Sequence, residues 1–573
     1  MPTRNEMWQR LGDEVDLLVI GGGINGAGIA RDAAQRGLRV AMVEMQDLAF
    51  GTSSRSSKLV HGGLRYLEMM EFALVFEAVS ERRILLDLAP HLVNPLGFLF
   101  PVYKHSRRSL TTINAGLWMY EGLSLFRSPQ RPRKLRPADV AREEPTLNRE
   151  LLRGAPLYYD CSTDDARLTL ENGIAAARDG AAVLTYTKAV GFERDKEGRI
   201  VAVELEDQHT GARRTVRAHV TVNATGPWTD LTIGLNPDSD TRPMLRPTKG
   251  VHIVVPHAVL PVNHAVVCFH PEDRRVLFAL PWGDATYVGT TDTDFTGDPA
   301  HVYATAEDVD YLIAAAAAYF PDNLIGYDDI QCTWAGLRPL VAPGGGKDGV
   351  DESAVSREHT IHVGRDGLIT IAGGKLTTYR RMCAEVVDTA VKMLRMRDQL
   401  PANIQKGRTD ETPLPGAIGW PENDDHDAVA AQVIEASGQR IEPDTARLLA
   451  DTYGMRSIEV ARLVTSNPAL GERLLAHRPE ILAQIDFAVH EELATTVTDI
   501  IKQRTQIFYR DADQGLGCVA KTGARLQQLL GWDDATRAAR EEAYREEVRL
   551  ARRWREEVEA RSRPVVPIGS IDV

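Results

Sequence analysis

The sequence has few cysteines, and none of them is paired. The five cysteines are scattered along the chain and never form a Cys-x-x-Cys pair, so neither a disulfide framework nor a structural zinc site is expected. Asp292 and Asp294 begin like a calcium loop, but no glutamate follows at the twelfth position. The sequence therefore predicts no metal site and is typical of a reducing compartment.

Long apolar runs and surplus positive charge are also missing. No uninterrupted apolar stretch reaches the about 18 residues of a membrane-spanning helix, and residues 1–15 do not resemble a signal peptide. Lys and Arg total 67 against 80 Asp and Glu, a net charge of −13, which argues against general nucleic-acid binding. Gly-x-Ser-x-Gly and Walker A motifs are absent, so hydrolase and phosphotransferase functions have no support. We expect a cytoplasmic protein that binds no nucleic acid.

A strand, a glycine-rich loop and a helix are predicted over residues 16–30. Gly21, Gly23 and Gly26 fit the Gly-x-Gly-x-x-Gly fingerprint, in which the glycines allow a tight turn, close approach to a pyrophosphate and packing of helix on strand. A diphosphate is expected at the positive end of this helix. The next strand ends in Glu44, whose carboxylate is placed to accept hydrogen bonds from a ribose.

Two later segments repeat this pattern of strand and turn. Residues 220–228 end in a turn at Gly226 and Trp228, and residues 368–380 turn into a helix after Gly374. N–H groups at a helix start point at an anion, and the edge of a reduced flavin is such an anion. Residues 51–66 carry hydroxyls, three cations and a histidine, so we expect this segment to hold ligand as well.

Seven blocks in order give the sequence a resemblance to one family. They begin at Gly21, Ser57, Asn223, Lys249, Gly289, Gly336 and Gly373. With them the chain resembles, over nearly its whole length, the flavin-linked, quinone-reducing glycerol-3-phosphate dehydrogenases within the wider family of FAD-dependent amine and hydroxyl oxidases. The resemblance implies tightly held FAD and oxidation of sn-glycerol 3-phosphate to dihydroxyacetone phosphate by hydride transfer from C2 to N5 of FAD, with electrons passed to a membrane quinone. The insertion at residues 343–349 departs from the family's pattern.

The predicted fold class is α/β: a Rossmann-like FAD-binding domain with an inserted antiparallel-sheet substrate domain, followed by an all-α C-terminal domain. Alternating strands predict the inserted sheet, and apolar spacings of three and four predict the helices. The predicted bounds are 14–96, 158–240 and 336–398 for the FAD-binding domain, 97–157 and 241–335 for the substrate domain, 399–426 for a linker and 427–561 for the helical domain.

The residues expected to bind FAD lie in the recognised blocks or beside the fingerprint. They are Gly21, Gly23, Gly26, Glu44, Thr52, Ser53, Ser57, Gly226, Trp228, Gly374, Lys375, Leu376 and Thr377.

Holding a small phosphate dianion needs several fixed donors, best supplied by guanidinium groups. Arg65, Arg338 and Lys375 bracket the flavin in the recognised blocks, Tyr66 adds a neutral donor, and Arg357 is a further candidate. We expect these five residues to bind the substrate, with Arg338 and Lys375 also acting in catalysis.

Oxidation of a secondary alcohol also needs a base, and a neutral imidazole suits pH 7. His61 and His252 are the two histidines in recognised blocks. We favour His252 slightly because an alternating strand holds its ring rigidly, which leaves His61 to orient substrate or flavin.

Two other functions stay open at this point. One is an oxidase of the same substrate that reduces O₂ to hydrogen peroxide, and the other is a non-catalytic FAD-binding protein. A quinone acceptor requires contact with the membrane surface, and residues 98–136 are the candidate segment for this contact. Trp118, Leu123, Leu125 and Phe126 precede a basic run there. The cations of that run are Arg127, Arg131, Arg133, Lys134 and Arg136.

Apolar residues beside cations are typical of a membrane-surface segment, although a core helix followed by a solvated basic loop explains them equally well. We expect peripheral association with the inner face of the cell membrane and leave a homodimer open. The charged helix over residues 541–555 is interpreted as a solvated face.

Overall fold

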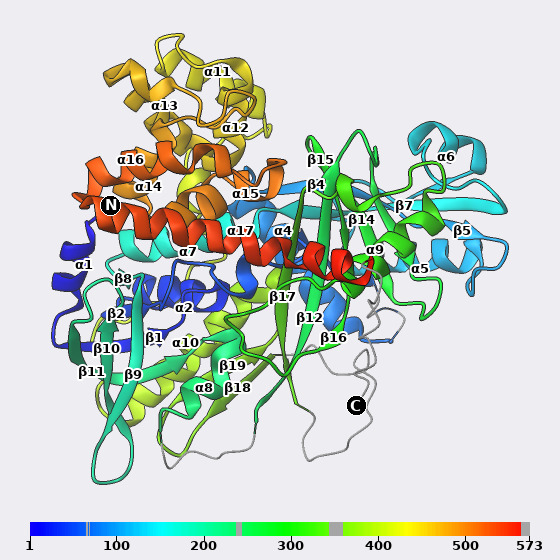
Figure 1. Ribbon diagram of the computed structural model, residues 1–573. Helices are drawn as coiled ribbons and strands as arrows, with labels where there is room; N and C mark the ends of the chain where they lie inside the picture. Colours follow the sequence, from blue (N-terminus) through cyan, green and yellow to red (C-terminus); the bar gives the residue numbers. More distant parts are fainter. Residues whose placement is uncertain (65–66, 68, 237–242, 343–358, 563–573) are drawn as a thin grey trace, which may run out of the picture.

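The computed structural model describes residues 1–64, 67, 69–236, 243–342 and 359–562 (Figure 1). Two sheets form the body of the described chain, and a helical C-terminal region packs against β17 of the second sheet and against α7, which lies beside the first. The predicted α/β class with an all-α C-terminal domain is confirmed. Within the described ranges, no helix has the length and apolarity to cross a membrane.

The first sheet contains the dinucleotide fingerprint. Its main path is β18 (His359–Val363), β19 (Ile369–Gly373), β11 (Arg213–Asn223), β1 (Glu14–Ile20), β2 (Val40–Val43) and β8 (Ala182–Leu184), and β10 (Ile200–Asp207) with β9 (Thr187–Arg194) extends from β11. β1 pairs in parallel with β2 and with β11, and β11 pairs in parallel with β19. The carboxyl ends of these four strands therefore lie on the same edge of the sheet, where open α/β sheets bind ligands.

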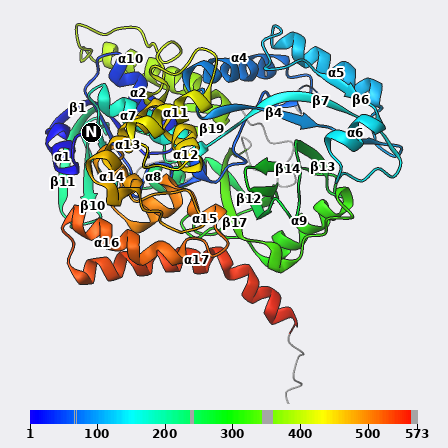
Figure 2. The same ribbon diagram turned by 90° about the horizontal axis from the view of Figure 1, so that it is seen from above.

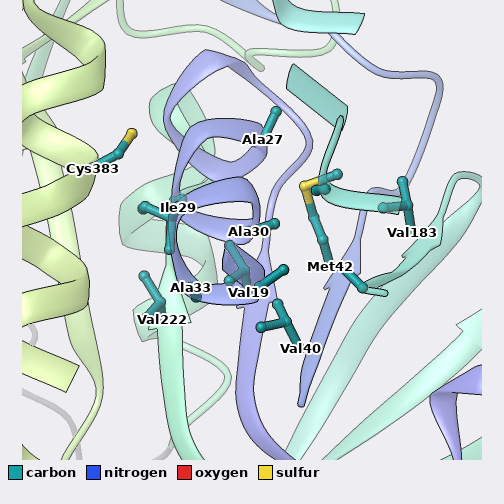
Figure 3. Packing of buried hydrophobic residues seen from close by; sticks show 14 of the residues in the cluster. Val19, Ala27, Ile29, Ala30, Ala33, Val40, Met42, Val183, Val222 and Cys383 are labelled. Atoms are coloured by element: carbon teal, nitrogen blue, oxygen red, sulfur yellow. The ribbon is translucent and has the colours of Figure 1, made fainter. Parts of the chain in front are cut away.

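Small apolar residues let the helix after β1 lie close to this sheet. Ala27, Ala30 and Ala33 of α2 (Ile24–Gln35) are buried, and Figure 3 shows Ala30 and Ala33 beside Val19 of β1. α2 also packs against α7 (Asp165–Arg178) and α10 (Tyr379–Met396). The fingerprint loop thus rests on a tightly packed layer.

The second sheet has eleven strands. Its main path is β16 (Thr293–Asp294), β12 (Leu245–Pro256), β15 (Ala285–Gly289), β14 (Val276–Trp282), β13 (Ala265–Phe269), β4 (Val93–Leu99), β7 (Leu152–Thr163) and β3 (Leu59–Val60), with β17 (Cys332–Val341) on β12, and β5 (Val102–Tyr103) and β6 (Arg133–Leu135) on β7. The predicted antiparallel pairing holds except between β13 and β4, which are parallel. The helices beside this sheet are α4 (Phe72–Leu88), α5 (Leu110–Leu123), α6 (Pro137–Glu143) and α9 (Ala306–Tyr319).

Three of the predicted domain bounds fall inside strands of this second sheet. The divisions at residues 96, 157 and 335 cut β4, β7 and β17, each of which continues with its neighbours in register. Burial does not alternate along these strands, and they contain Pro95, Pro156 and Pro339, a residue type usual in turns, so the sequence does not mark them as continuous strands. The strand ends are better places for the divisions, and the remaining domain bounds stay a prediction.

The C-terminal region is helical, as expected. It contains α11 (His426–Ala436), α12 (Pro443–Tyr453), α13 (Ser457–Ser466), α14 (Ala483–Glu491), a π-helix (Asp499–Arg504), α15 (Ile507–Arg510), α16 (Val519–Leu530) and α17 (Asp534–Ser562). α1 (Arg4–Leu11) packs at the other end of the chain against β8.

The charged helix α17 is more than a solvated face. Its side chains at Tyr544, Val548 and Trp554 are buried, and α17 contacts α16, α9 and β17. Figure 1 shows it running from the C-terminal helices across to the second sheet. The charged residues cover one face of the helix while an apolar stripe on the other packs, as in other amphipathic helices.

Buried ion pairs join the C-terminal region to the first sheet. Arg167 on α7 binds Glu492, with Nη1 and Oε2 2.8 Å apart, and Arg504 binds Asp47 in the loop after β2, with Nη2 and Oδ1 3.0 Å apart. Removing one partner of such a pair leaves an uncompensated buried charge. These pairs therefore fix how the helical region docks.

Candidate active site

Two glycines of the fingerprint, Gly21 and Gly26, sit where no side chain fits. A Cβ on Gly21 would lie 2.5 Å from the carbonyl oxygen of Ala224, and a Cβ on Gly26 would lie 1.8 Å from the carbonyl oxygen of Gly21. The turn after β1 is thus pressed against the end of β11 and against the first turn of α2. This close packing is what the fingerprint predicts.

The N-terminus of α2 is open to an anion. Its N-cap is Gly23, which supplies no capping side chain, and the Ile24 N–H donates to Ser53 Oγ at 2.9 Å. The first N–H groups of a helix lack partners within the helix, and the helix dipole favours negative charge there. A diphosphate fits this position.

Glu44 lies at the end of β2, beside the same loop. Its Oε2 accepts from the Gly22 N–H at 2.6 Å and its Oε1 from the Gln46 N–H at 2.9 Å. An ionised carboxylate has about four lone-pair sites, so these two bonds orient Glu44 and leave acceptor capacity for ribose hydroxyls.

The two later turns reach the same edge of the sheet. Gly226 follows β11 at φ +54° and opens a 3₁₀ helix (Gly226–Trp228). Gly374 follows β19 at φ +86°, where a Cβ would lie 2.2 Å from Met382 Cε. A second 3₁₀ helix (Leu376–Thr378) comes next. The predicted FAD-binding residues after β1, β2, β11 and β19 thus follow four neighbouring strand ends.

The loop over residues 51–58 connects this edge to the second sheet. Thr52 Oγ1 donates to the Leu337 carbonyl at 2.6 Å, and Trp334 Nε1 donates to the Ser56 carbonyl at 3.2 Å. The Trp228 ring lies beside Gly51, where a Cβ would be 3.0 Å from Cζ3. The predicted residues Thr52, Ser53, Ser57 and Trp228 therefore lie around one site, and the whole set fits a dinucleotide.

His252 is held within the second sheet. It is 2% exposed, its Nε2 lies 2.9 Å from Ser57 Oγ, and its ring stacks on Trp334 with centroids 4.5 Å apart. Nδ1 is buried and makes no hydrogen bond with the described residues. Burial, aided by the positive charges of Arg338 and Lys58, lowers the pKa of His252 well below its usual value.

His61 lies at the other side of the site. It follows β3, and its backbone N–H and carbonyl both bond Thr377 Oγ1, at 3.0 and 3.1 Å. Thr377 belongs to the turn after β19, two residues beyond Lys375. The structure therefore brings His61 and Lys375 to one place, and the His61 side chain is half-buried rather than sealed.

Arg338 lies on β17 and is already engaged. Its Nη1 lies 3.0 Å from Asp292 Oδ1, and its Nη2 donates to Thr290 Oγ1 and to the Thr291 carbonyl, each at 3.1 Å. β17 of the second sheet contacts β19 of the first, and Lys375 lies in the turn after β19. Asp294 likewise forms an ion pair, with Arg246 at 2.6 Å.

Three of the predicted substrate-binding residues are not placed. Arg65, Tyr66 and Arg357 lie outside the described residues.

Several residues that shape the site were missed by the sequence reasoning. Asp160 accepts from the Gly62 N–H at 3.3 Å and from the Tyr120 hydroxyl at 2.8 Å, and so fixes the segment that carries His61. Lys58 is buried and binds Asp165 at 2.6 Å. Lys58 lies within the block that begins at Ser57, and Trp334 lies two residues before the block that begins at Gly336, which is a usable signal, whereas nothing in the sequence marks Asp160.

Comparison with protein families defines the class to which this site belongs. Residues 16–380 match the model described as FAD dependent oxidoreductase, and residues 407–537 match the model described as the C-terminal domain of alpha-glycerophosphate oxidase. The chain is thus an FAD-dependent oxidoreductase. This agrees with the FAD cradle, by which we mean the loops that follow β1, β2, β11 and β19 at one edge of the first sheet.

Curated relatives narrow this class. The chain is 36% identical to the aerobic glycerol-3-phosphate dehydrogenase of Staphylococcus epidermidis over 539 residues, which is 94% of each chain. It is 40% identical to glycerol-3-phosphate dehydrogenase 2 of Mycobacterium tuberculosis over 531 residues, covering 92% of this chain and 87% of that one. The chain therefore belongs to the family of FAD-dependent glycerol-3-phosphate dehydrogenases.

Solved structures agree with this assignment. The glycerol-3-phosphate dehydrogenase of Bacillus halodurans, complexed with FAD, matches with a TM-score of 0.78 at 31% identity, covering 96% of this chain and 97% of that one. The L-alpha-glycerophosphate oxidase of Mycoplasma pneumoniae, with FAD bound, matches at 17% identity with a TM-score of 0.52, covering 70% of this chain and 99% of that one. The second likeness shows a shared fold only.

Proposed function

We propose that the protein oxidises sn-glycerol 3-phosphate to dihydroxyacetone phosphate and passes the electrons to a membrane quinone. Two observations support this substrate. Relatives that match nearly the whole chain are named glycerol-3-phosphate dehydrogenases, and Arg338 lies on β17, which contacts β19, the strand that Lys375 follows. Two cations beside the cofactor suit a phosphate dianion.

The residues after β1, β2, β11 and β19 hold the cofactor, with the α2 N-terminus on the diphosphate and Glu44 on a ribose. Bound FAD supplies the acceptor for the hydride from C2 of the substrate. The chain itself supplies two further kinds of functional group: cations that hold the substrate phosphate in one orientation, and a base that takes the proton of the substrate hydroxyl. Positioning of this kind places the reacting atoms close together before reaction.

We assign the base to His61 rather than to His252, the residue that we favoured from the sequence. A general base must reach the proton it takes, directly or through one water. His252 is 2% exposed, with Nε2 on Ser57 and Nδ1 buried, and its lowered pKa makes it a weak proton acceptor. His61 is half-buried beside the turn that carries Lys375. His252 then positions Ser57.

Replacing Arg338 by methionine is expected to lower kcat/KM for glycerol 3-phosphate strongly. Loss of one charged contact to a desolvated partner costs about 2–5 kcal/mol, which corresponds to a roughly thirty- to several thousandfold loss. Steady-state kinetics with an artificial electron acceptor measure this effect. The rate with unphosphorylated glycerol, already very low, should stay unchanged.

The matched control for this variant is Arg246→Met. Arg246 also binds a carboxylate of the same short segment, Asp294, but at an exposed position. It is expected to leave kcat/KM within about threefold of the wild type, since exposed ion pairs contribute about 0–1 kcal/mol. Equal losses in both variants, or an equal loss with glycerol, would show that Arg338 does not bind the phosphate.

The quinone part of the proposal is supported by an exposed apolar patch. The patch comprises Met69, Met70, Phe76, Trp118, Met119, Leu125 and Phe126. It lies on and around α4 and α5, which contact each other and run along one edge of the molecule in Figure 2. Exposed apolar residues gathered on neighbouring elements are typical of interaction or membrane sites.

The backbone at the end of α5 strengthens this assignment. Leu125 and Phe126 are each 56% exposed and adopt φ values of 51° and 59°. The left-handed region is costly for residues other than glycine. The chain thus holds two largely exposed apolar side chains on a strained turn, where the Arg131 guanidinium lies over the Phe126 ring, 4.9 Å from its centroid.

The basic run contributes less than the sequence suggested. Arg131 binds Glu121, Arg133 binds Glu143 and Arg136 binds Asp139. These carboxylates offset most of the local positive charge. We therefore propose that apolar contact is the main source of peripheral membrane attachment at the cytoplasmic face.

A triple variant, Trp118→Ser with Leu125→Ser and Phe126→Ser, is expected to lower sedimentation with anionic phospholipid vesicles at least tenfold. Each lost insertion costs about 1–2 kcal/mol at partial depth. Anaerobic flavin reduction should be unchanged. The control triple variant changes the similarly exposed Leu324, Met396 and Ile418 to serine and should bind vesicles normally. Unchanged sedimentation of the first variant, or rapid peroxide formation with O₂ in place of quinone turnover, would contradict this acceptor assignment.

A further inference from the structure

A cavity lies where the C-terminal helices meet the second sheet. It is bounded by β17, the π-helix, α15 and α17, and Figure 2 shows α15, α17 and β17 close together on the lower side of the molecule. Its volume is about 40 Å³, and since a water needs about 10–15 Å³ on this measure, it has room for a small ion. Among the described residues, its walls include none of those proposed to bind FAD or substrate.

The charged groups of the cavity do not balance. Lys502 and Glu547 line the wall and pair with each other. Arg55 also lines it, and among the residues that the structure describes it makes no ion pair. Two cations therefore face one carboxylate. Although burial opposes ionisation of Glu547, Lys502 and Arg55 together lower its pKa, which reflects the positive potential here.

Two polar groups at the cavity also lack partners. Arg55 Nε and the Tyr509 hydroxyl are buried, and neither makes a hydrogen bond with the described part of the chain. Tyr509 is 1% exposed. Buried polar groups in folded proteins are nearly always hydrogen-bonded, and an unmade bond costs about 1–3 kcal/mol. Arg55 Nε–H can only donate, and the Tyr509 hydroxyl can donate as well as accept, so an acceptor between them satisfies both groups.

We propose that this cavity binds one small oxyanion, of the size of phosphate or sulfate, between Arg55 and Tyr509. A singly charged anion offsets the surplus cation, and its oxygens accept from Arg55 Nε and from the tyrosine hydroxyl. Glu547 does not exclude it because that carboxylate is already bound to Lys502. A neutral ligand or water satisfies the donors but leaves the charge unbalanced.

The bound anion lies close to the catalytic side of the sheet. Trp334 forms part of the cavity wall, and the same indole stacks on His252 and donates to the Ser56 carbonyl. Arg55 itself belongs to the loop over residues 51–58 that carries Ser57. The proposed site therefore adjoins the catalytic side through Arg55 and Trp334, but it contains none of the residues proposed to bind substrate.

Equilibrium dialysis of the FAD-containing protein with radiolabelled inorganic phosphate tests the proposal. The experiment is run anaerobically with and without excess glycerol 3-phosphate, because phosphate is also expected to enter the substrate site. The wild type should retain one equivalent of phosphate that glycerol 3-phosphate does not displace. Arg55→Met should lose this equivalent, and Tyr509→Phe should weaken it roughly ten- to hundredfold.

Arg83→Met is the matched control, since Arg83 is an exposed arginine on α4; it should bind as the wild type does. Tyr509→Phe removes only the hydroxyl, so it keeps the test decisive if Arg55→Met fails to fold. Absence of an undisplaced equivalent in the wild type, or its retention in both variants, would overturn the proposal. A second equivalent that glycerol 3-phosphate also fails to displace would instead contradict the proposed substrate.

Discussion

Replacing Gly23 by valine is expected to give a folded protein that contains no FAD. The backbone at Gly23 has φ −74°, which valine adopts readily, and a Cβ there would lie 3.1 Å from Ser53 Oγ, a contact that a small shift relieves. The methyl groups of valine, however, stand in front of the N–H groups at the start of α2. The diphosphate cannot then approach the backbone.

Flavin absorbance per mole of protein after gel filtration, together with circular dichroism, measures this effect. Gly122→Val is the control, because a Cβ at Gly122 meets nothing within 4 Å, and this variant should keep its flavin. Gly26 is unsuitable for the test, since a side chain there clashes with the Gly21 carbonyl at 1.8 Å and disrupts the turn itself. A folded Gly23→Val protein with full flavin content would show that the cofactor lies elsewhere.

Replacing His61 by alanine is expected to slow flavin reduction by roughly 10²–10⁴-fold, the usual contribution of a general base. Because hydroxide takes over part of the role, the rate should recover as pH rises, and added imidazole should restore some of it. His252→Ala should act differently: it removes a partner of Ser57 and a ring stacked on Trp334, so FAD or substrate affinity should fall more than the rate.

Anaerobic stopped-flow spectroscopy separates the two variants, and His301→Ala, at an exposed position, serves as control. The pattern of rescue is the decisive feature, since a purely structural role for His61 does not produce recovery with imidazole. If His252→Ala shows the large, rescuable loss and His61→Ala does not, the initial preference for His252 from its strand position was correct and the assignment to His61 is wrong.

The FAD cradle could be predicted because each of its sequence motifs lies within a few residues of one strand end. Gly21, Gly23 and Gly26 report backbone constraints within one turn, and Glu44, Gly226 and Gly374 each directly follow a recognisable strand. Parallel pairing of β1, β2, β11 and β19 then brings these strand ends together. The α/β class follows from the same features.

The burial and the hydrogen-bond partners of the candidate catalytic residues could not be predicted from the sequence in the same way. The burial of His252, its bond to Ser57 and its stacking on Trp334 depend on how β12 and β17 pair and on which loop covers them. Asp160 supports the His61 segment from a distant strand. Likewise, Glu121 forms an ion pair with Arg131 and lowers the net positive charge of the basic run, although the sequence alone does not show this pairing. Such contacts are set by packing between segments far apart in sequence.

The most direct test of the central claim is anaerobic mixing of the purified, FAD-containing protein with sn-glycerol 3-phosphate while the flavin absorbance is recorded. The account predicts rapid bleaching of the oxidised flavin band, formation of dihydroxyacetone phosphate in a one-to-one ratio with reduced FAD, and very little bleaching with glycerol. A flavin that stays oxidised with glycerol 3-phosphate, or that glycerol bleaches equally fast, would contradict it.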